Sequence, residues 1–173
     1  MKKILLILAA VIMLPWLAGA QDGRNRLVTT VIADAMAQLP AQDRSIYNTM
    51  MTDLASTGAE GVEKMAAMLV PAAKGQNNIV EYALNGLASY VTVPGREMMA
   101  RNMSDGLEKA IVKCNDIPNK CFLISLLGTC GSDDNIPFLE TLVSNKNTRD
   151  IALNTITRMP GARNAIIRQI NAS

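Results

Sequence analysis

A seven-residue pattern that occurs twice in this chain of 173 residues constrains its fold more than any other feature. Residues 81–87 read Glu-Tyr-Ala-Leu-Asn-Gly-Leu, and residues 150–156 read Asp-Ile-Ala-Leu-Asn-Thr-Ile. The offset of 69 residues between the two copies corresponds to two helical-hairpin units of ~30 to 40 residues each. Residues 120–126 lie between them and keep the Leu-x-x-aliphatic part of the pattern. The recurrence predicts a repeat protein rather than an enzyme built around one pocket.

The N-terminus has the residue order of a secretory signal peptide. Lys2 and Lys3 precede an apolar run over residues 4–17, and small residues follow up to Ala20, just before a polar stretch. The run is interrupted by Pro15 and is shorter than the about 20 apolar residues that span a bilayer. We therefore expect a signal peptide over residues 1–20, cleavage after Ala20, and a periplasmic or secreted protein that does not associate with a membrane after cleavage. The alternative is that the segment is kept as a membrane anchor.

The charge of the chain gives no sign of a nucleic-acid partner. Its sequence holds 17 basic and 15 acidic residues, and two of the lysines lie in the predicted signal peptide. From residue 21 onward 15 basic residues therefore balance 15 acidic ones, and no run of Lys and Arg is present. Because binding to phosphates requires a clustered positive surface, we expect no nucleic-acid partner.

Apolar residues recur at helical spacing along most of the chain, and no segment alternates strictly over more than a few residues. Ala, Leu and Met, which are abundant here, also form helices readily. These patterns predict an all-α protein of about four antiparallel helix pairs. The expected units cover residues 24–57, 58–93, 95–130 and 131–161, with a partial unit at 162–173.

Local predictions follow from proline, glycine and the aromatic residues. We expect one helix over residues 61–70, and a second over residues 121–127 after a break at residues 116–118. We expect a further helix over residues 96–113, within which Gly106 slightly lowers the helix propensity. The core is expected to contain the aliphatic residues together with Phe122, Phe138 and the three tyrosines.

The composition argues against an enzyme. The chain contains no histidine, which removes the commonest general base, the usual nucleophile triads and most zinc sites. Carboxylate pairs could still act as acid and base, but pairs such as Asp105 with Glu108 stand at turns and on helix faces, where acids stabilise helix starts. We expect no catalytic residue, no cofactor and no metal.

Three cysteines, Cys114, Cys121 and Cys130, fall within the third predicted unit. Their spacing does not fit a zinc site, for which C-x-x-C pairs are typical. Two interpretations remain. The thiols are small buried core residues, or Cys114 forms a disulfide with Cys121 or Cys130, as an oxidising compartment allows.

Eleven methionines raise the hypothesis of copper binding. Met98, Met99 and Met103 lie close in sequence, and thioethers are soft ligands that prefer Cu(I). Methionine also fills irregular gaps in ordinary cores. We expect packing to explain these residues, with periplasmic copper binding as a minor alternative.

A family resemblance is carried by residues 131–142, which read Gly-Ser-Asp-Asp-Asn-Ile-Pro-Phe-Leu-Glu-Thr-Leu, and by Arg149-Asp150-Ile151-Ala152-Leu153. An acidic turn, an apolar first helix, a polar turn and an Arg-x-x-Ala second helix make this stretch resemble a HEAT repeat. Residues 58–90 are similar, although Val80 and Glu81 replace the arginine. The resemblance implies a right-handed α-solenoid in which the second helices of the pairs line the concave face.

If the resemblance holds, the polar residues of the second helices face a protein or peptide partner, and the chain is an exported scaffold. The candidate partner-binding residues are Asn85, Ser89, Ser125, Asn154 and Arg158. A competing interpretation is that Asn85 and Asn154 bond the neighbouring turn and hold one repeat on the next, because a buried amide must find partners. A different function class is the N-terminal helical segment of a larger exported enzyme or assembly, which the apolar last helix over residues 162–170 would suit. The identity of the partner and the oligomeric state stay open.

Overall fold

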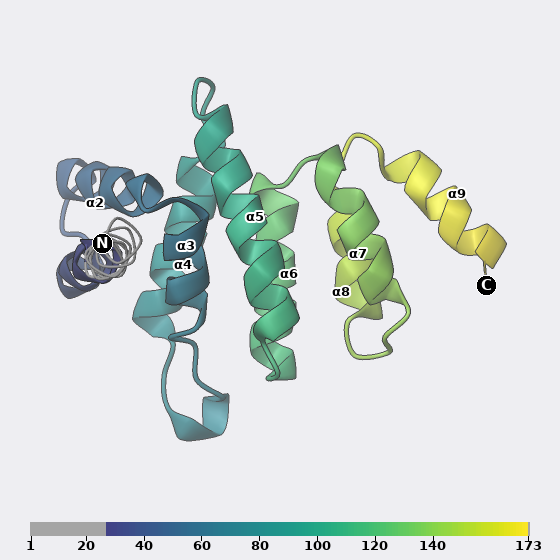
Figure 1. Ribbon diagram of the computed structural model, residues 1–173, viewed down its shortest axis with the longest axis horizontal. Helices are drawn as coiled ribbons and strands as arrows, with labels where there is room; N and C mark the ends of the chain where they lie inside the picture. Colours follow the sequence, from purple (N-terminus) through teal and green to yellow (C-terminus); the bar gives the residue numbers. More distant parts are fainter. Residues whose placement is uncertain (1–26, 173) are drawn as a thin grey trace, which may run out of the picture.

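The computed structural model describes residues 27–172, and within this range every regular element is a helix (Figure 1). The all-α prediction is therefore confirmed. The predicted signal peptide over residues 1–20, its cleavage after Ala20 and the start of the first expected unit lie outside the described residues.

The helices follow one another along the chain with short connections. Residues 27–38 are helical. They are followed by α2 (Arg44–Ser56), α3 (Gly58–Ala66), the 3-10 turn η1 (Ala72–Lys74), α4 (Asn78–Tyr90), α5 (Glu97–Lys113), α6 (Ile117–Cys130), the 3-10 turn η2 (Asp133–Asn135), α7 (Ile136–Val143), α8 (Arg149–Ile156) and α9 (Ala162–Ala172).

The helices stand side by side in a row that leads from the N-terminal to the C-terminal end of the described chain (Figure 1). In that view α3, α5 and α7 lie in front, and α4, α6 and α8 lie behind them. Helix α4 contacts α6, which contacts α8, and in the front layer α3 packs closely on α5. Within the pairs, α3 contacts α4, α5 contacts α6 and α7 contacts α8. The helices of each pair therefore pack against each other, and neighbouring pairs are joined by the contacts of α3 with α5, α4 with α6 and α6 with α8.

Two helix boundaries differ from the sequence prediction. Helix α3 begins at Gly58, whose φ of 64° suits glycine and lets the chain turn directly out of α2. It ends at Ala66, and the segment that leads to Pro71 is not helical. Helix α6 begins at Ile117, so Pro118 lies in its first turn rather than in a break. Proline is tolerated there because the first N–H groups of a helix have no partner within the helix. The Asp116 carboxylate caps this turn by accepting from the Asn119 N–H at 3.0 Å.

The core is aliphatic and lies between the two layers. One cluster of buried Leu, Ile, Val, Ala and Met side chains runs from the first described helix to α9. The prediction that aromatic residues belong to the buried core is wrong. Phe122, Phe138, Tyr47 and Tyr90 are only partly buried at its edge, and Tyr82 is 37% exposed. Aliphatic side chains let the layers approach more closely than aromatic rings would.

Gly106 is a point of close approach between α3 and α5, not merely a weakness in α5. A Cβ atom at this position would lie 2.7 Å from the Ala59 carbonyl oxygen and 2.7 Å from the Val62 Cβ. Only glycine leaves room for the α3 backbone there. Glycine at this position makes helix formation less favourable by about 1 kcal/mol than alanine would, but it permits the close contact between the helices.

Candidate functional site

The five candidate partner-binding residues belong to the rear layer of helices. Asn85 and Ser89 lie on α4, Ser125 lies on α6, Asn154 lies on α8, and Arg158 lies just beyond the end of α8. Because α6 contacts both α4 and α8, these residues come from three consecutive neighbours. We name the surface formed by these five residues the rear face.

The two copies of the seven-residue pattern occupy matching environments. Ala83 and Ala152 are both fully buried, while Asn85 and Asn154 are both exposed. Leu84 is fully buried, whereas Leu153, at the matching position, is partly buried. Helices α4 and α8 therefore direct equivalent residues to the core and to the surface.

The third copy keeps the buried leucines of the pattern, since Leu123 and Leu126 are buried as Leu84 and Leu87 are, but it differs at the position of the asparagine. Aligned by pattern, Ile124 would match Asn85, but Ile124 is fully buried. Ser125 is half-buried and takes the outward position instead. An apolar run such as Leu-Ile-Ser-Leu-Leu does not define its own register, so burial between α4 and α8 decides it.

Asn85 and Asn154 do not hold neighbouring repeats together. The Asn85 amide Nδ2 donates to the Glu81 carbonyl of its own helix at 2.9 Å. Within the described part of the chain the Asn154 side chain has no hydrogen-bond partner, and its exposure explains why it needs none. The interpretation that these amides tie repeats is therefore wrong. A contact between repeats comes from buried Thr155, whose hydroxyl donates to the Ile124 carbonyl at 3.4 Å.

Arg158 lies across α6. A Cβ atom built on Gly128 would come within 3.0 Å of the Arg158 Cδ atom, so the aliphatic part of the arginine covers this glycine. The Arg158 side chain makes no ion pair within residues 27–172. Its charge is therefore available to a partner. Ser125 lies one turn before Gly128 on the same helix.

The sequence analysis did not predict a contact between two tyrosines beside the rear face, near α2. The Tyr47 and Tyr82 rings meet edge to face with their centroids 6.4 Å apart, and the Tyr47 hydroxyl donates to the Gly86 carbonyl at 3.2 Å. Burial, followed by the neighbouring Tyr82, raises the pKa of Tyr47. Tyr47 and Tyr82 belong to different predicted units, so no local pattern brings them together.

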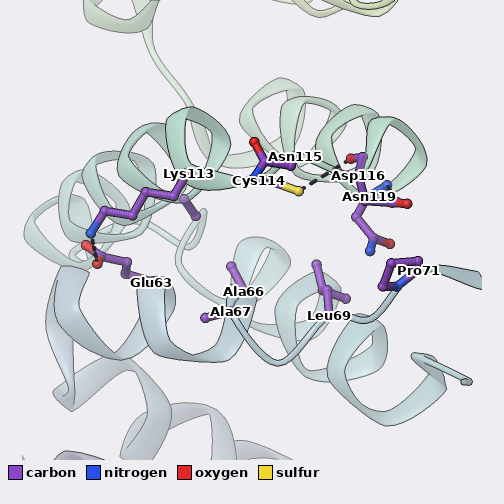
Figure 2. A pocket seen from close by; sticks show the side chains of 11 residues that line it. Glu63, Ala66, Ala67, Leu69, Pro71, Lys113, Cys114, Asn115, Asp116 and Asn119 are labelled. Atoms are coloured by element: carbon purple, nitrogen blue, oxygen red, sulfur yellow. Dashed lines mark hydrogen bonds and ion pairs between the residues drawn. The ribbon is translucent and has the colours of Figure 1, made fainter. Parts of the chain in front are cut away.

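A second feature is a cavity of about 360 Å³ between α3 and the turn that joins α5 to α6. Figure 2 shows Ala66, Ala67 and Leu69 on one side and Cys114 on the other. The Lys113 Nζ and Glu63 Oε1 atoms form an ion pair of 2.6 Å at one end. The remaining lining residues are Pro71, Ala110, Asn115, Asp116 and Asn119.

The polar groups around this cavity are bonded to one another. Asn119 donates to the Val70 carbonyl at 3.1 Å and accepts from Asn77 Nδ2 at 3.2 Å. Asn77 in turn bonds both the Val70 N–H and the Val70 carbonyl. Side-chain bonding to Lys113 is the main cause that lowers the pKa of Glu63. No buried side-chain polar atom among the described residues lacks a partner.

The three cysteines are free thiols in three places. Cys114 donates to the Asp116 carbonyl at 3.4 Å and Cys121 to the Asn147 carbonyl at 3.5 Å. Cys130 ends the helix that follows Cys114, so about 20 Å of helix separates them, which is too far for a disulfide. Pairing of Cys114 with Cys130 is therefore wrong, and pairing of Cys114 with Cys121 stays a prediction.

Cys130 is expected to resist alkylation in the native protein. Burial raises its thiol pKa to about 12, so raising the pH from 7 to 9 produces almost no thiolate there, and the thiolate is the nucleophile. Burial also raises the pKa of Cys114 and Cys121, but both remain partly exposed. In protein treated with a reductant, iodoacetamide labelling followed by mass spectrometry should modify Cys121 and Cys114 first and Cys130 only after denaturation. Labelling of native Cys130 at the rate of Cys121 would contradict this environment.

On α5, methionines pack in or against the core, and an acidic side chain accepts a hydrogen bond from a neighbouring segment. Met103 is 1% exposed and Met99 packs against the core, whereas Met98 is 70% exposed. This placement favours packing over copper binding. Glu108 accepts from the buried Asn135 amide at 2.8 Å beside a polar cavity of about 490 Å³, which Asp105 also lines.

Two further properties bear on function. Over the described residues no group of three or more Cys, Asp or Glu side chains is arranged to hold a metal ion. Within the same range, no helix combines the length and the apolar character required to cross a membrane.

The search for related proteins covered family models, curated proteins and solved structures, and none of them matches this chain.

Proposed function

We propose that this chain is an exported, non-enzymatic helical-repeat scaffold that binds a protein or peptide partner through the rear face. The repeat would be HEAT-like, with the pairs forming a right-handed solenoid and the second helices lining its concave side. The observation that carries the proposal is that Asn85 and Asn154 are exposed at equivalent positions of α4 and α8. Neither is consumed by contacts between repeats.

The residue types on and beside this face support a partner of polypeptide nature. Asn and Ser side chains offer both donors and acceptors to a peptide backbone. Tyrosine and arginine dominate the binding energy of many protein interfaces, and Tyr82 and Arg158 are both exposed. The face therefore combines polar groups with two residues of the kind that anchor partners.

The proposal is tested by affinity capture from the native envelope or secretome with the full chain as bait. Asn154→Asp with Arg158→Glu makes the rear face more acidic, and we expect it to lose the specific partner. The matched control is Asn164→Asp with Arg163→Glu on α9, which makes the same chemical changes at two exposed residues away from the face. Retention of the same partners by the rear-face variant would argue against this surface.

A further inference from the structure

We propose that the cavity between α3 and the α5–α6 turn binds a neutral, largely apolar small molecule. This site is separate from the rear face, because none of the five rear-face residues lines it. A negative result for one of the two proposals therefore does not contradict the other.

The size and lining of the cavity suit a small ligand. Its volume of about 360 Å³ falls within the roughly 300 to 1,000 Å³ of typical small-molecule sites, which are mostly apolar with a few polar groups. Buried Ala66 and Ala110, together with Leu69 and Pro71, supply apolar walls. Small side chains on facing helices leave the space that a larger residue would fill.

The charge balance of the walls selects a neutral ligand. Glu63 and Lys113 neutralise each other in their ion pair, and the Asp116 carboxylate is engaged in capping α6. The Asn119 amide bonds on both of its sides. A charged ligand would lose hydration without meeting an uncompensated opposite charge, which is costly. The exposed Asn115 amide, which also lines the cavity, can make a polar contact with a neutral ligand. Apolar contact is therefore the main interaction that these walls offer.

The cavity is held open by contacts between two predicted units. The Asn77–Val70–Asn119 hydrogen bonds fix the segment between α3 and α4 to the start of α6. The Glu63–Lys113 ion pair joins α3 to α5 at the other end. A site formed in advance avoids the ordering cost of binding.

The test uses the neutral fluorophore N-phenyl-1-naphthylamine and the full chain. We expect saturable fluorescence enhancement that Ala67→Phe weakens roughly tenfold or more, since the ring would occupy the ligand's space. Ala67 is exposed at the end of α3, so this substitution leaves the core intact. Ala37→Phe, at an exposed alanine of the first described helix, is the matched control and should bind as the unmodified chain does.

A second measurement needs no substitution. In the reduced protein, saturating fluorophore should slow alkylation of Cys114, which lines the cavity, and leave alkylation of Cys121 unchanged as an internal reference. The proposal is overturned if fluorescence does not saturate, if Ala67→Phe binds as tightly as Ala37→Phe, or if Cys114 and Cys121 are protected equally. The last two outcomes would place the dye on an unspecific apolar surface.

Discussion

Replacing Gly106 with alanine is expected to destabilise the protein by about 1–3 kcal/mol, as overpacking of a close contact does. The added Cβ would lie 2.7 Å from the Ala59 carbonyl oxygen and from the Val62 Cβ, so α3 and α5 must separate. Helix propensity alone predicts the opposite sign, a gain of up to about 1 kcal/mol. Urea denaturation followed by far-UV circular dichroism measures the change in the free energy of unfolding.

Gly128 provides the matched control within α6. A Cβ atom there would meet only the flexible Arg158 side chain and the Thr155 methyl group at 3.0 Å or more. The arginine can move toward solvent, so Gly128→Ala should be neutral or stabilising by up to about 1 kcal/mol. Equal stabilisation by both substitutions would show that α3 and α5 do not approach closely at Gly106.

Leu84→Ala is expected to cost about 2–5 kcal/mol, the range for truncation of a buried leucine. Leu84 is fully buried where α4 packs against its neighbours, and the lost side chain would leave a cavity between the layers. The same denaturation experiment measures the loss. If Leu84→Ala left the free energy of unfolding nearly unchanged, α4 would not be packed between two other helix pairs.

The equivalent substitution in the later copy, Leu153→Ala, should cost clearly less. Leu153 matches Leu84 in the pattern but is only partly buried, so it removes less apolar surface from water on folding. The difference between the two losses in the free energy of unfolding measures how differently these two matching leucines are buried. Equal losses would contradict the burial difference.

The repetition of Ala-Leu-Asn was enough to predict helices, but it left open whether the two asparagines face outward or bond a neighbouring repeat. A buried Ala and an exposed Asn two residues later lie on opposite sides of a helix, whereas in a strand they would share one face. The same periodicity left the ends of α3 and α6 open, because those ends depend on a left-handed glycine at Gly58 and on a cap at Asp116. Such local geometry overrides apolar spacing at helix boundaries.

The parts that sequence reasoning missed are contacts between distant segments. Tyr47 meets Tyr82, Asn77 meets Asn119, and Gly106 meets α3. Each pair joins elements from different predicted units, and no spacing along the chain records which helices become neighbours. The role of Asn85 stayed open in the sequence for the same reason, since the choice between a bond to its own helix and a bond to the next depends on packing.

The arrangement of α4, α6 and α8 as consecutive neighbours with one shared face can be measured by electron spin resonance. Spin labels would be placed at exposed positions 85 and 154 in a variant whose three cysteines are replaced, with circular dichroism used to check folding. Two helix spacings of ~8–10 Å each predict a narrow distribution near roughly 20 Å between the backbones, lengthened by the reach of the labels. A broad distribution, or one centred beyond about twice that separation, would contradict a stack in which these helices lie side by side.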